Sequence, residues 1–189
     1  MSVIKHKEQR VGVFLDVQNL YHSAKHLYQG ARVNFKEVLR EAVAGRKLIR
    51  ALAYVVKTET AEEQAFFEAL TKLGIELKVK DLQVFPGGMK KGDWDVGLAV
   101  DAIKLAPALD AIIIASGDGD FVSLIDYLKN SVGIQVEVMA FGRSASARLK
   151  ESADDFVDLG EKVEQFIFPN KTKGYTSRFL GRFGKEKDF

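Results

Sequence analysis

Hydrophobic positions along the chain follow two different periods, which predict strands and helices in turn. Short apolar runs predict strands at residues 11–17, 48–56, 111–115 and 134–140. Apolar residues at helical spacing predict helices at residues 20–28, 35–44, 60–73, 96–106 and 121–130. Asn34 is a suitable N-cap for the second of these helices, and Gly45 is expected to end it.

The remaining segments have weaker patterns. Residues 75–84 begin by alternating apolar and charged side chains, which predicts a strand near the edge of a sheet. Beyond residue 140 we expect a helix at 145–151, a short strand near Phe156 and a brief helix ending near Phe166. Strands that alternate with helices favour a mostly parallel sheet, because parallel neighbours need crossover connections. The sequence therefore predicts an α/β fold, a three-layer α/β/α sandwich, over residues 1–168.

Composition narrows the class of protein. The chain has 189 residues, 47% of them hydrophobic, and no Cys. This length and composition favour one globular domain with a full core. The lack of Cys excludes disulfides, thiolate metal sites and cysteine nucleophiles, and it favours a reducing compartment. Because the sequence shows neither a signal peptide nor a long apolar run, we expect a cytoplasmic protein with no membrane partner.

The C-terminal tail, residues 169–189, differs in charge from the rest. Residues 170–189 contain six Lys or Arg and two acidic residues, whereas the preceding part of the chain is slightly acidic. Tyr175, Phe179 and Phe183 would share one face of a helix, which favours docking onto the domain or onto a second copy in a homodimer. Direct binding of RNA by the tail and disorder are the alternatives.

Acidic residues gather where predicted strands end. Asp16 closes the first strand, Asp118 and Asp120 follow the strand at 111–115, and Asp95 opens a helix. Functional groups in open α/β sheets gather at the carboxyl ends of the strands. Asp101 lies six positions after Asp95, a rotation of roughly 240° on a helix, so the two side chains point in different directions.

If Asp16, Asp95, Asp118 and Asp120 converge, their repulsion needs a cation. Two unit charges about 4 Å apart cost roughly 4 kcal/mol at an effective dielectric of 20. Oxygen ligands favour Mg²⁺ or Mn²⁺, which polarises phosphoryl oxygens and lowers the pKa of bound water. The alternative interpretation is that each Asp only forms a turn or caps a helix.

Neighbouring residues suggest how a substrate would be held. Asn19 and Ser116 are candidates for orienting water or phosphate, and Lys90, Lys91 and Arg143 are candidates for binding phosphate. An exposed turn is the alternative for the two lysines. For Trp94, anchoring the start of a helix is favoured over stacking on a base.

Other motifs have little support. His22 and His26 are four residues apart, but the Glu of a zinc protease motif is missing, so we expect them to be surface or core residues. The dinucleotide fingerprint, the phosphate-binding loop of nucleotide hydrolases and the Gly-x-Ser-x-Gly elbow are all absent from the sequence.

Three segments together resemble a known family. They read Phe-Leu-Asp-Val-Gln-Asn-Leu (14–20), Lys-Gly-Asp-Trp-Asp-Val-Gly-Leu-Ala-Val-Asp-Ala (91–102) and Ser-Gly-Asp-Gly-Asp-Phe (116–121). They resemble the signature segments of the NYN domain, in the LabA/DUF88 group of PIN-like ribonuclease domains, over about residues 10–160. The resemblance implies a PIN-like fold and Mg²⁺- or Mn²⁺-dependent cleavage of RNA. It also implies that Asp16, Asp95, Asp118 and Asp120 are the family's acidic positions, Asn19 its asparagine and Ser116 its small hydroxyl residue.

Three functional hypotheses follow. The first is a metal-dependent endoribonuclease that acts on single-stranded RNA. The second is a regulatory or scaffold module that binds RNA or protein through the same fold without cutting. A metal-dependent phosphatase or DNA nuclease is a third reading of the same acidic residues.

Overall fold

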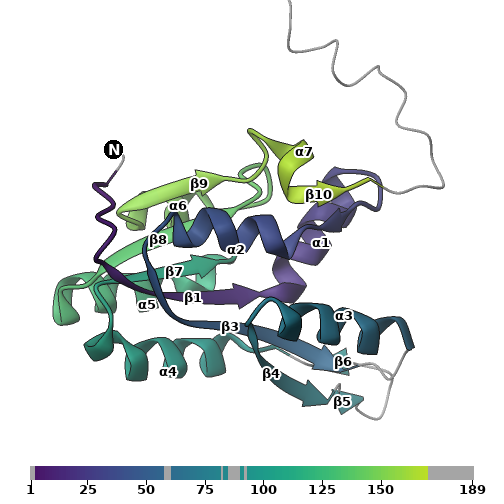
Figure 1. Ribbon diagram of the computed structural model, residues 1–189, viewed down its shortest axis with the longest axis horizontal. Coiled ribbons are helices and arrows are strands. Elements are labelled where there is room, and N and C mark those ends of the chain that lie inside the picture. Colours follow the sequence, from purple (N-terminus) through teal and green to yellow (C-terminus); the bar gives the residue numbers. More distant parts are fainter. Residues whose placement is uncertain (1–2, 58–60, 82, 85–89, 92, 170–189) are drawn as a thin grey trace, which may run out of the picture.

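A six-stranded parallel sheet forms the centre of the computed structural model (Figure 1). The structure describes residues 3–57, 61–81, 83–84, 90–91 and 93–169. The strand order is β4-β3-β1-β7-β8-β9, and each neighbouring pair is parallel. The strands are β1 (Arg10–Asp16), β3 (Lys47–Lys57), β4 (Glu76–Asp81), β7 (Ala111–Ala115), β8 (Gln135–Ala140) and β9 (Asp155–Asp158). All carboxyl ends therefore lie at one edge. The strands β3 and β4 follow on one side of β1 and the strands β7, β8 and β9 on its other side, so the order in which strands are added reverses between β1 and β7.

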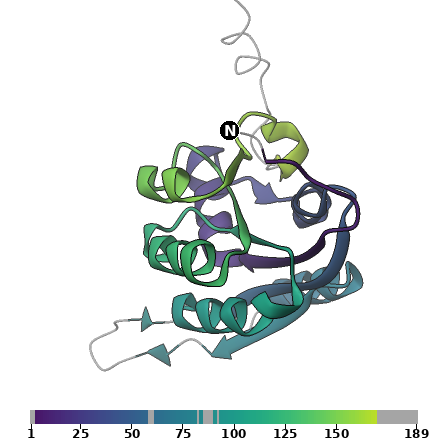
Figure 2. The same ribbon diagram turned by 90° about the vertical axis from the view of Figure 1, so that its left-hand side faces the viewer.

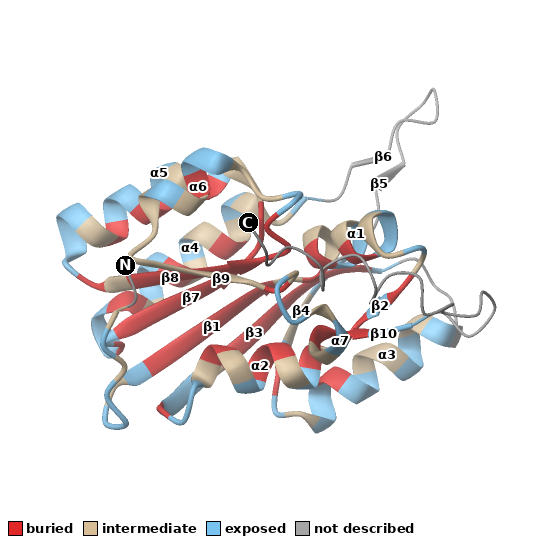
Figure 3. Cartoon of the chain, turned by 90° about the horizontal axis from the view of Figure 1, so that it is seen from above, coloured by how far each residue is buried: buried red, intermediate tan, exposed pale blue. Residues whose placement is uncertain are grey.

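Helices cover both faces of this sheet (Figures 2 and 3). On one face lie α1 (Val17–Leu27), α2 (Phe35–Val43), α3 (Ala61–Lys72) and α7 (Val163–Phe166). On the other lie α4 (Asp95–Leu105), α5 (Val122–Tyr127) and α6 (Ala147–Ser152). The predicted three-layer α/β/α sandwich with a mostly parallel sheet is confirmed.

The core follows from the alternation of side chains along buried strands. In β7, Ile113 packs into the cluster under α1 and α2, whereas Ile112 and Ile114 pack into the cluster under α4 and α5. All five residues of β7 are buried. The strand predicted at residues 111–115 is thus apolar at every position because it is buried on both faces.

Local signals set several element boundaries. The Asn34 side chain accepts a hydrogen bond from the N–H of Glu37 and caps α2, as predicted. The helix ends where Ala44 and Gly45 take left-handed backbone angles. Glycine adopts these angles without the steric cost that a Cβ brings, so Gly45 suits the end of the helix.

Four short elements differ from the predicted pattern. The segment predicted as one strand over 75–84 contains β4 and a separate β5 (Gln83–Val84), which pairs antiparallel with β6 (Lys90–Lys91). The strands β2 (Arg32–Val33) and β10 (Ile167–Phe168) also pair with each other. Two-residue pairings are too short for any periodicity, so tertiary contacts alone define them.

The predicted helix at 121–130 is made of three shorter pieces. A 3₁₀ turn (Gly119–Phe121) leads into α5, and a π-helical turn (Leu128–Val132) follows it before Gly133.

The tail at 170–189 lies outside the described residues, so the domain boundary after residue 168, the docking of the tail and the homodimer stay predictions. No helix in the described part of the chain has the length and apolar character that crossing a bilayer requires.

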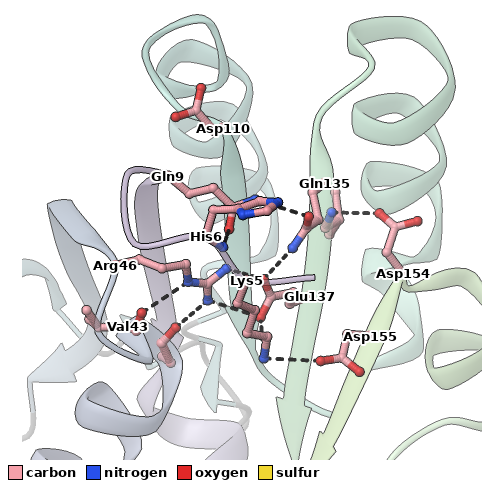
Figure 4. Close-up of polar contacts among 12 residues, drawn as sticks. Lys5, His6, Gln9, Val43, Arg46, Asp110, Gln135, Glu137, Asp154 and Asp155 are labelled. Carbon is pink, nitrogen blue, oxygen red and sulfur yellow. Dashed lines mark hydrogen bonds and ion pairs between the residues drawn. The ribbon is translucent and has the colours of Figure 1, made fainter. Parts of the chain in front are cut away.

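A buried polar network closes the amino-terminal side of the sheet (Figure 4). Arg46, just before β3, pairs with Glu137 in β8, and their side chains are only 0% and 2% exposed. Lys5 reaches the same carboxylate at 3.0 Å and also contacts Asp155 in β9 at 3.1 Å. Burial alone would raise the pKa of Glu137, but hydrogen bonds from Arg46 and Lys5 hold that pKa below its usual value.

Candidate active site

Asp16 and Asn19 connect the ends of β1 and β7. Asp16 caps α1, because its Oδ1 accepts a hydrogen bond from the N–H of Asn19 at 3.1 Å. Its Oδ2 accepts a hydrogen bond from the Ser116 hydroxyl at 2.9 Å. The side-chain oxygen of Asn19 in turn accepts from the N–H of Gly117 at 2.9 Å. The two strand ends that flank the change of direction in the sheet are therefore fixed to each other.

Ser116 shapes the loop that carries the next two acids. Its side chain is fully buried, and its Oγ accepts a hydrogen bond from the N–H of Asp118 at 3.2 Å. Asp118 then accepts from the N–H of Asp120 at 3.0 Å. Since the Ser116 hydroxyl already donates to one acid and accepts from the backbone of another, the geometry favours a positioning role for it.

Trp94 fixes the helix that carries Asp95. Its indole N–H donates to the carbonyl of Val55 at 2.9 Å, and its ring packs on Tyr54 at 5.4 Å between centroids. A Cβ on Gly97 would lie only 2.5 Å from the Trp94 ring, so the ring covers the first turn of α4 at a position that needs glycine. The structure places Trp94 as an anchor, the interpretation that the sequence favoured.

Three of the four predicted acids form a compact group. Carboxylate oxygens of Asp95, Asp118 and Asp120 all lie within 4.8 Å of one another. Burial, followed by the charges of Asp118 and Asp16, raises the pKa of Asp95 to about 6. A cation would relieve this repulsion, and a set of carboxylate oxygens matches the ligand preference of Mg²⁺ or Mn²⁺.

Asp16 stands beside this group and is not part of it. Burial raises its pKa, although hydrogen bonds from Asn19 and Ser116 act in the opposite direction, and the charge of Asp118 adds to the rise. Both of its carboxylate oxygens already accept hydrogen bonds. Direct binding of the ion by Asp16 stays a prediction.

Asp101 takes no part in the group, as the helical spacing predicted. Its carboxylate accepts a hydrogen bond from the Tyr54 hydroxyl at 3.1 Å and pairs with Lys78 at 3.3 Å.

His22 and His26 are exposed on α1, with ring centroids 6.5 Å apart. Neither histidine belongs to a metal-binding group within the described residues.

The predicted phosphate-binding residues are placed only in part. Lys90 and Lys91 form β6, but their side chains lie outside the described part of the structure. Arg143 is exposed in the loop that follows β8. This loop packs on the acidic loop, since the N–H of Ser146 donates to the carbonyl of Gly117 at 3.0 Å. Arg143 therefore lies in a segment that borders the candidate site.

Sequence reasoning missed Asp158, which holds that bordering loop in place. Its Oδ1 accepts hydrogen bonds from the N–H groups of Gly142 at 2.8 Å and Gly160 at 2.7 Å. A Cβ on Gly142 would lie 2.0 Å from Asp158 Oδ2, so the backbone approaches the carboxylate as only glycine permits. Its position at the end of a strand, the signal used for Asp16, could have identified it.

Comparisons with known proteins agree with this arrangement. The family model described as NYN domain matches residues 10–160. The chain is 22% identical over 170 residues to the low amplitude and bright protein LabA of Synechococcus elongatus, covering 85% of this chain and 89% of that protein. It is also similar to the crystal structure of a protein of unknown function from Vibrio parahaemolyticus, with a TM-score of 0.79 and 28% identity over 88% of this chain and 100% of that chain.

Proposed function

Because the chain belongs to the NYN domain family, we propose that it is an endoribonuclease that hydrolyses single-stranded RNA with Mg²⁺ or Mn²⁺ held by its acidic residues. One observation carries the proposal. Three carboxylates converge within 4.8 Å at the carboxyl edge of a parallel sheet, next to the point where the chain reverses direction across it. Open α/β sheets bind their ligands in this position.

The donor set fits a divalent ion. Asp95, Asp118 and Asp120 supply oxygen ligands, and none of them forms an ion pair with a Lys or Arg of the described residues. A bound Mg²⁺ or Mn²⁺ would polarise the phosphate and make water a better nucleophile. With such an ion bound, hydrolysis of a phosphodiester would not require a nucleophilic side chain.

The surrounding residues would orient the acids and the substrate. Ser116 holds the carboxylate of Asp16 and the backbone of Asp118 in one arrangement. The side-chain oxygen of Asn19 accepts a hydrogen bond from the N–H of Gly117. The NH₂ group of Asn19 would then donate to a phosphate oxygen or to water. Arg143 and the lysines of β6 would bind the RNA backbone.

The deciding experiment follows cleavage of an end-labelled single-stranded RNA in Mn²⁺, Mg²⁺ or EDTA. We expect cuts with either metal and none in EDTA. Asp118→Asn should abolish them, because it removes a ligand charge but little volume. Asp126→Asn changes an exposed acid on α5 and is the matched control, purified in the same way to exclude contaminating ribonuclease.

Other outcomes would redirect the assignment. Full activity of folded Asp118→Asn would contradict the proposal. RNA binding without cleavage in any metal would favour the regulatory or scaffold function. Parallel assays on DNA and on phosphomonoesters distinguish a ribonuclease from a DNA nuclease or a phosphatase, which could use the same acidic residues.

A further inference from the structure

The exposed side of α1 gathers aromatic and basic side chains. Tyr21, His22, Lys25 and His26 are all exposed, and Tyr21 retains 41% of its accessible surface. The rings of Tyr21 and His22 meet edge to face at 5.6 Å, the rings of His22 and His26 stack at 6.5 Å, and the Lys25 ammonium lies 5.6 Å from the centre of the Tyr21 ring. No acidic residue occurs in α1. We call these four residues the α1 patch.

Two contacts place one side of α1 beside the candidate site. Asn19 bonds the acidic loop at Gly117, and Ser23 accepts a hydrogen bond from Ser144 at 2.9 Å, in the loop that carries Arg143. Positions 19, 22, 23 and 26 form one stripe of a helix. His22 and His26 therefore share the side of α1 that faces these two loops. Lys25 and Tyr21 extend the patch around the helix, away from the loops, through the contacts of Tyr21 with the His22 ring and with the Lys25 ammonium. Figure 1 shows α1 beginning at the carboxyl end of β1.

This combination of chemistry suits unpaired nucleobases. Flat rings exposed to solvent provide stacking surfaces, and a neighbouring ammonium attracts the phosphate backbone. Bases stack on aromatic side chains only where they are not already stacked and paired in a duplex. A strand cleaved at the acidic cluster must continue past its rim. His22 and His26 border that rim, so the next nucleotides could pass over them and on to Lys25 and Tyr21.

We propose that the α1 patch binds the bases of single-stranded RNA and so selects unpaired RNA over duplex. The proposal rests on the ribonuclease function, because it assigns the patch to the same substrate. It predicts that stacking by Tyr21 and His22 provides the preference for single strands. Lys25 contributes sequence-independent affinity through phosphate.

Binding of a fluorescent 12-nucleotide oligouridylate in EDTA tests the patch separately from cleavage. The double variant Tyr21→Ala/His22→Ala should bind the single strand about ten-fold more weakly while binding a 12-base-pair RNA duplex unchanged. Lys25→Ala should weaken both and reduce the slope of log affinity against log salt by about one. Tyr127→Ala is the matched control, because Tyr127 is also exposed, 45%, but lies at the far end of α5 from the acidic loop.

The outcomes separate the two proposals. Unchanged affinity of the folded double variant, or no RNA binding by the wild-type chain, would overturn the α1 patch and leave a protein partner as its alternative occupant. RNA binding that depends on the patch, together with no cleavage in any metal, would support the patch and contradict the ribonuclease. Metal-dependent cleavage by the wild type, together with unchanged RNA binding by the double variant, would support the ribonuclease and contradict the α1 patch. Thermal unfolding of each variant verifies that it is folded.

Discussion

Asp95 is held in a position that disfavours its negative charge. Burial and the nearby carboxylates raise its pKa to about 6, well above the value near 3.9 expected in the unfolded chain. An acid with a raised pKa in the folded state lowers stability as pH rises through that range, and the loss is complete above the folded pKa. The metal-free protein at pH 7 therefore carries a penalty that a bound cation would remove.

We expect Asp95→Asn to stabilise the metal-free protein. Asparagine keeps the shape and removes the charge, so the gain at pH 7 should be about 1 kcal/mol after allowing for solvent screening of a half-exposed group. Thermal unfolding in EDTA should show the midpoint rising by roughly 2–4 °C. At pH 5 the gain should shrink, because Asp95 is then protonated in the folded wild type.

Metal titration completes this test. Mn²⁺ should raise the unfolding temperature of the wild type, because a ligand that binds only the folded state stabilises it. It should have much less effect on Asp95→Asn. A variant that is less stable than the wild type in EDTA would show that the carboxylate makes a structural contribution that outweighs the repulsion.

At the scale of elements, α4 depends on the contact between Trp94 and Gly97. Replacing Gly with Ala inside a helix normally favours the helix by about 1 kcal/mol. Here the added Cβ would lie 2.5 Å and 2.9 Å from two carbons of the indole, far closer than packed atoms allow. Trp94 must then move, and its bond to the carbonyl of Val55 holds it against that movement.

We therefore expect Gly97→Ala to destabilise the protein by about 1–3 kcal/mol despite the better helix propensity. Asp95 precedes Gly97 by two residues, so Mn²⁺ affinity should fall as well. Chemical denaturation and metal titration measure the two effects. Val96→Ala, at a position 75% exposed on the same turn, is the control. It should leave Mn²⁺ affinity unchanged and should not destabilise the protein, because alanine has the higher helix propensity. A more stable Gly97→Ala protein would show that the indole moves without cost.

At the scale of the whole molecule, the sequence predicted what depends on periodicity and strand ends. Short apolar runs predicted the central strands. The rule that functional groups gather at the carboxyl ends of strands predicted that Asp118 and Asp120 belong to one group. The same rule could not tell that Asp16 stands beside that group, because side-chain direction depends on its bonds to Ser116 and Asn19. Glu137 could not be paired from sequence either, since Arg46 lies 91 residues earlier in the chain.

This pair joins distant parts of the chain. Arg46 bonds the end of α2 through the carbonyls of Ala42 and Val43, and Glu137 belongs to β8 on the other side of β1. We expect Arg46→Met to reduce the free energy of unfolding by about 3 kcal/mol, because it leaves a buried carboxylate with Lys5 as its remaining cation. In urea denaturation, the double variant Arg46→Met/Glu137→Leu should recover much of this loss. A loss of similar size in both would indicate that packing, not charge, dominates the contribution of Arg46.

Acid should weaken the same connection in the wild type. Although burial acts in the opposite sense, the bonds from Arg46 and Lys5 lower the pKa of Glu137 in the folded state. A carboxyl group with a lowered pKa stabilises the folded state above its unfolded pKa, and this stability is lost as pH falls through the folded pKa. The stability difference between wild type and Glu137→Gln should therefore be constant near neutral pH and shrink below about pH 4.5. Glu151→Gln, at an exposed position on α6, should follow the wild type throughout. If the stability difference between wild type and Glu137→Gln stays constant down to pH 3, the contribution of Glu137 comes from hydrogen bonding and does not depend on the carboxylate charge.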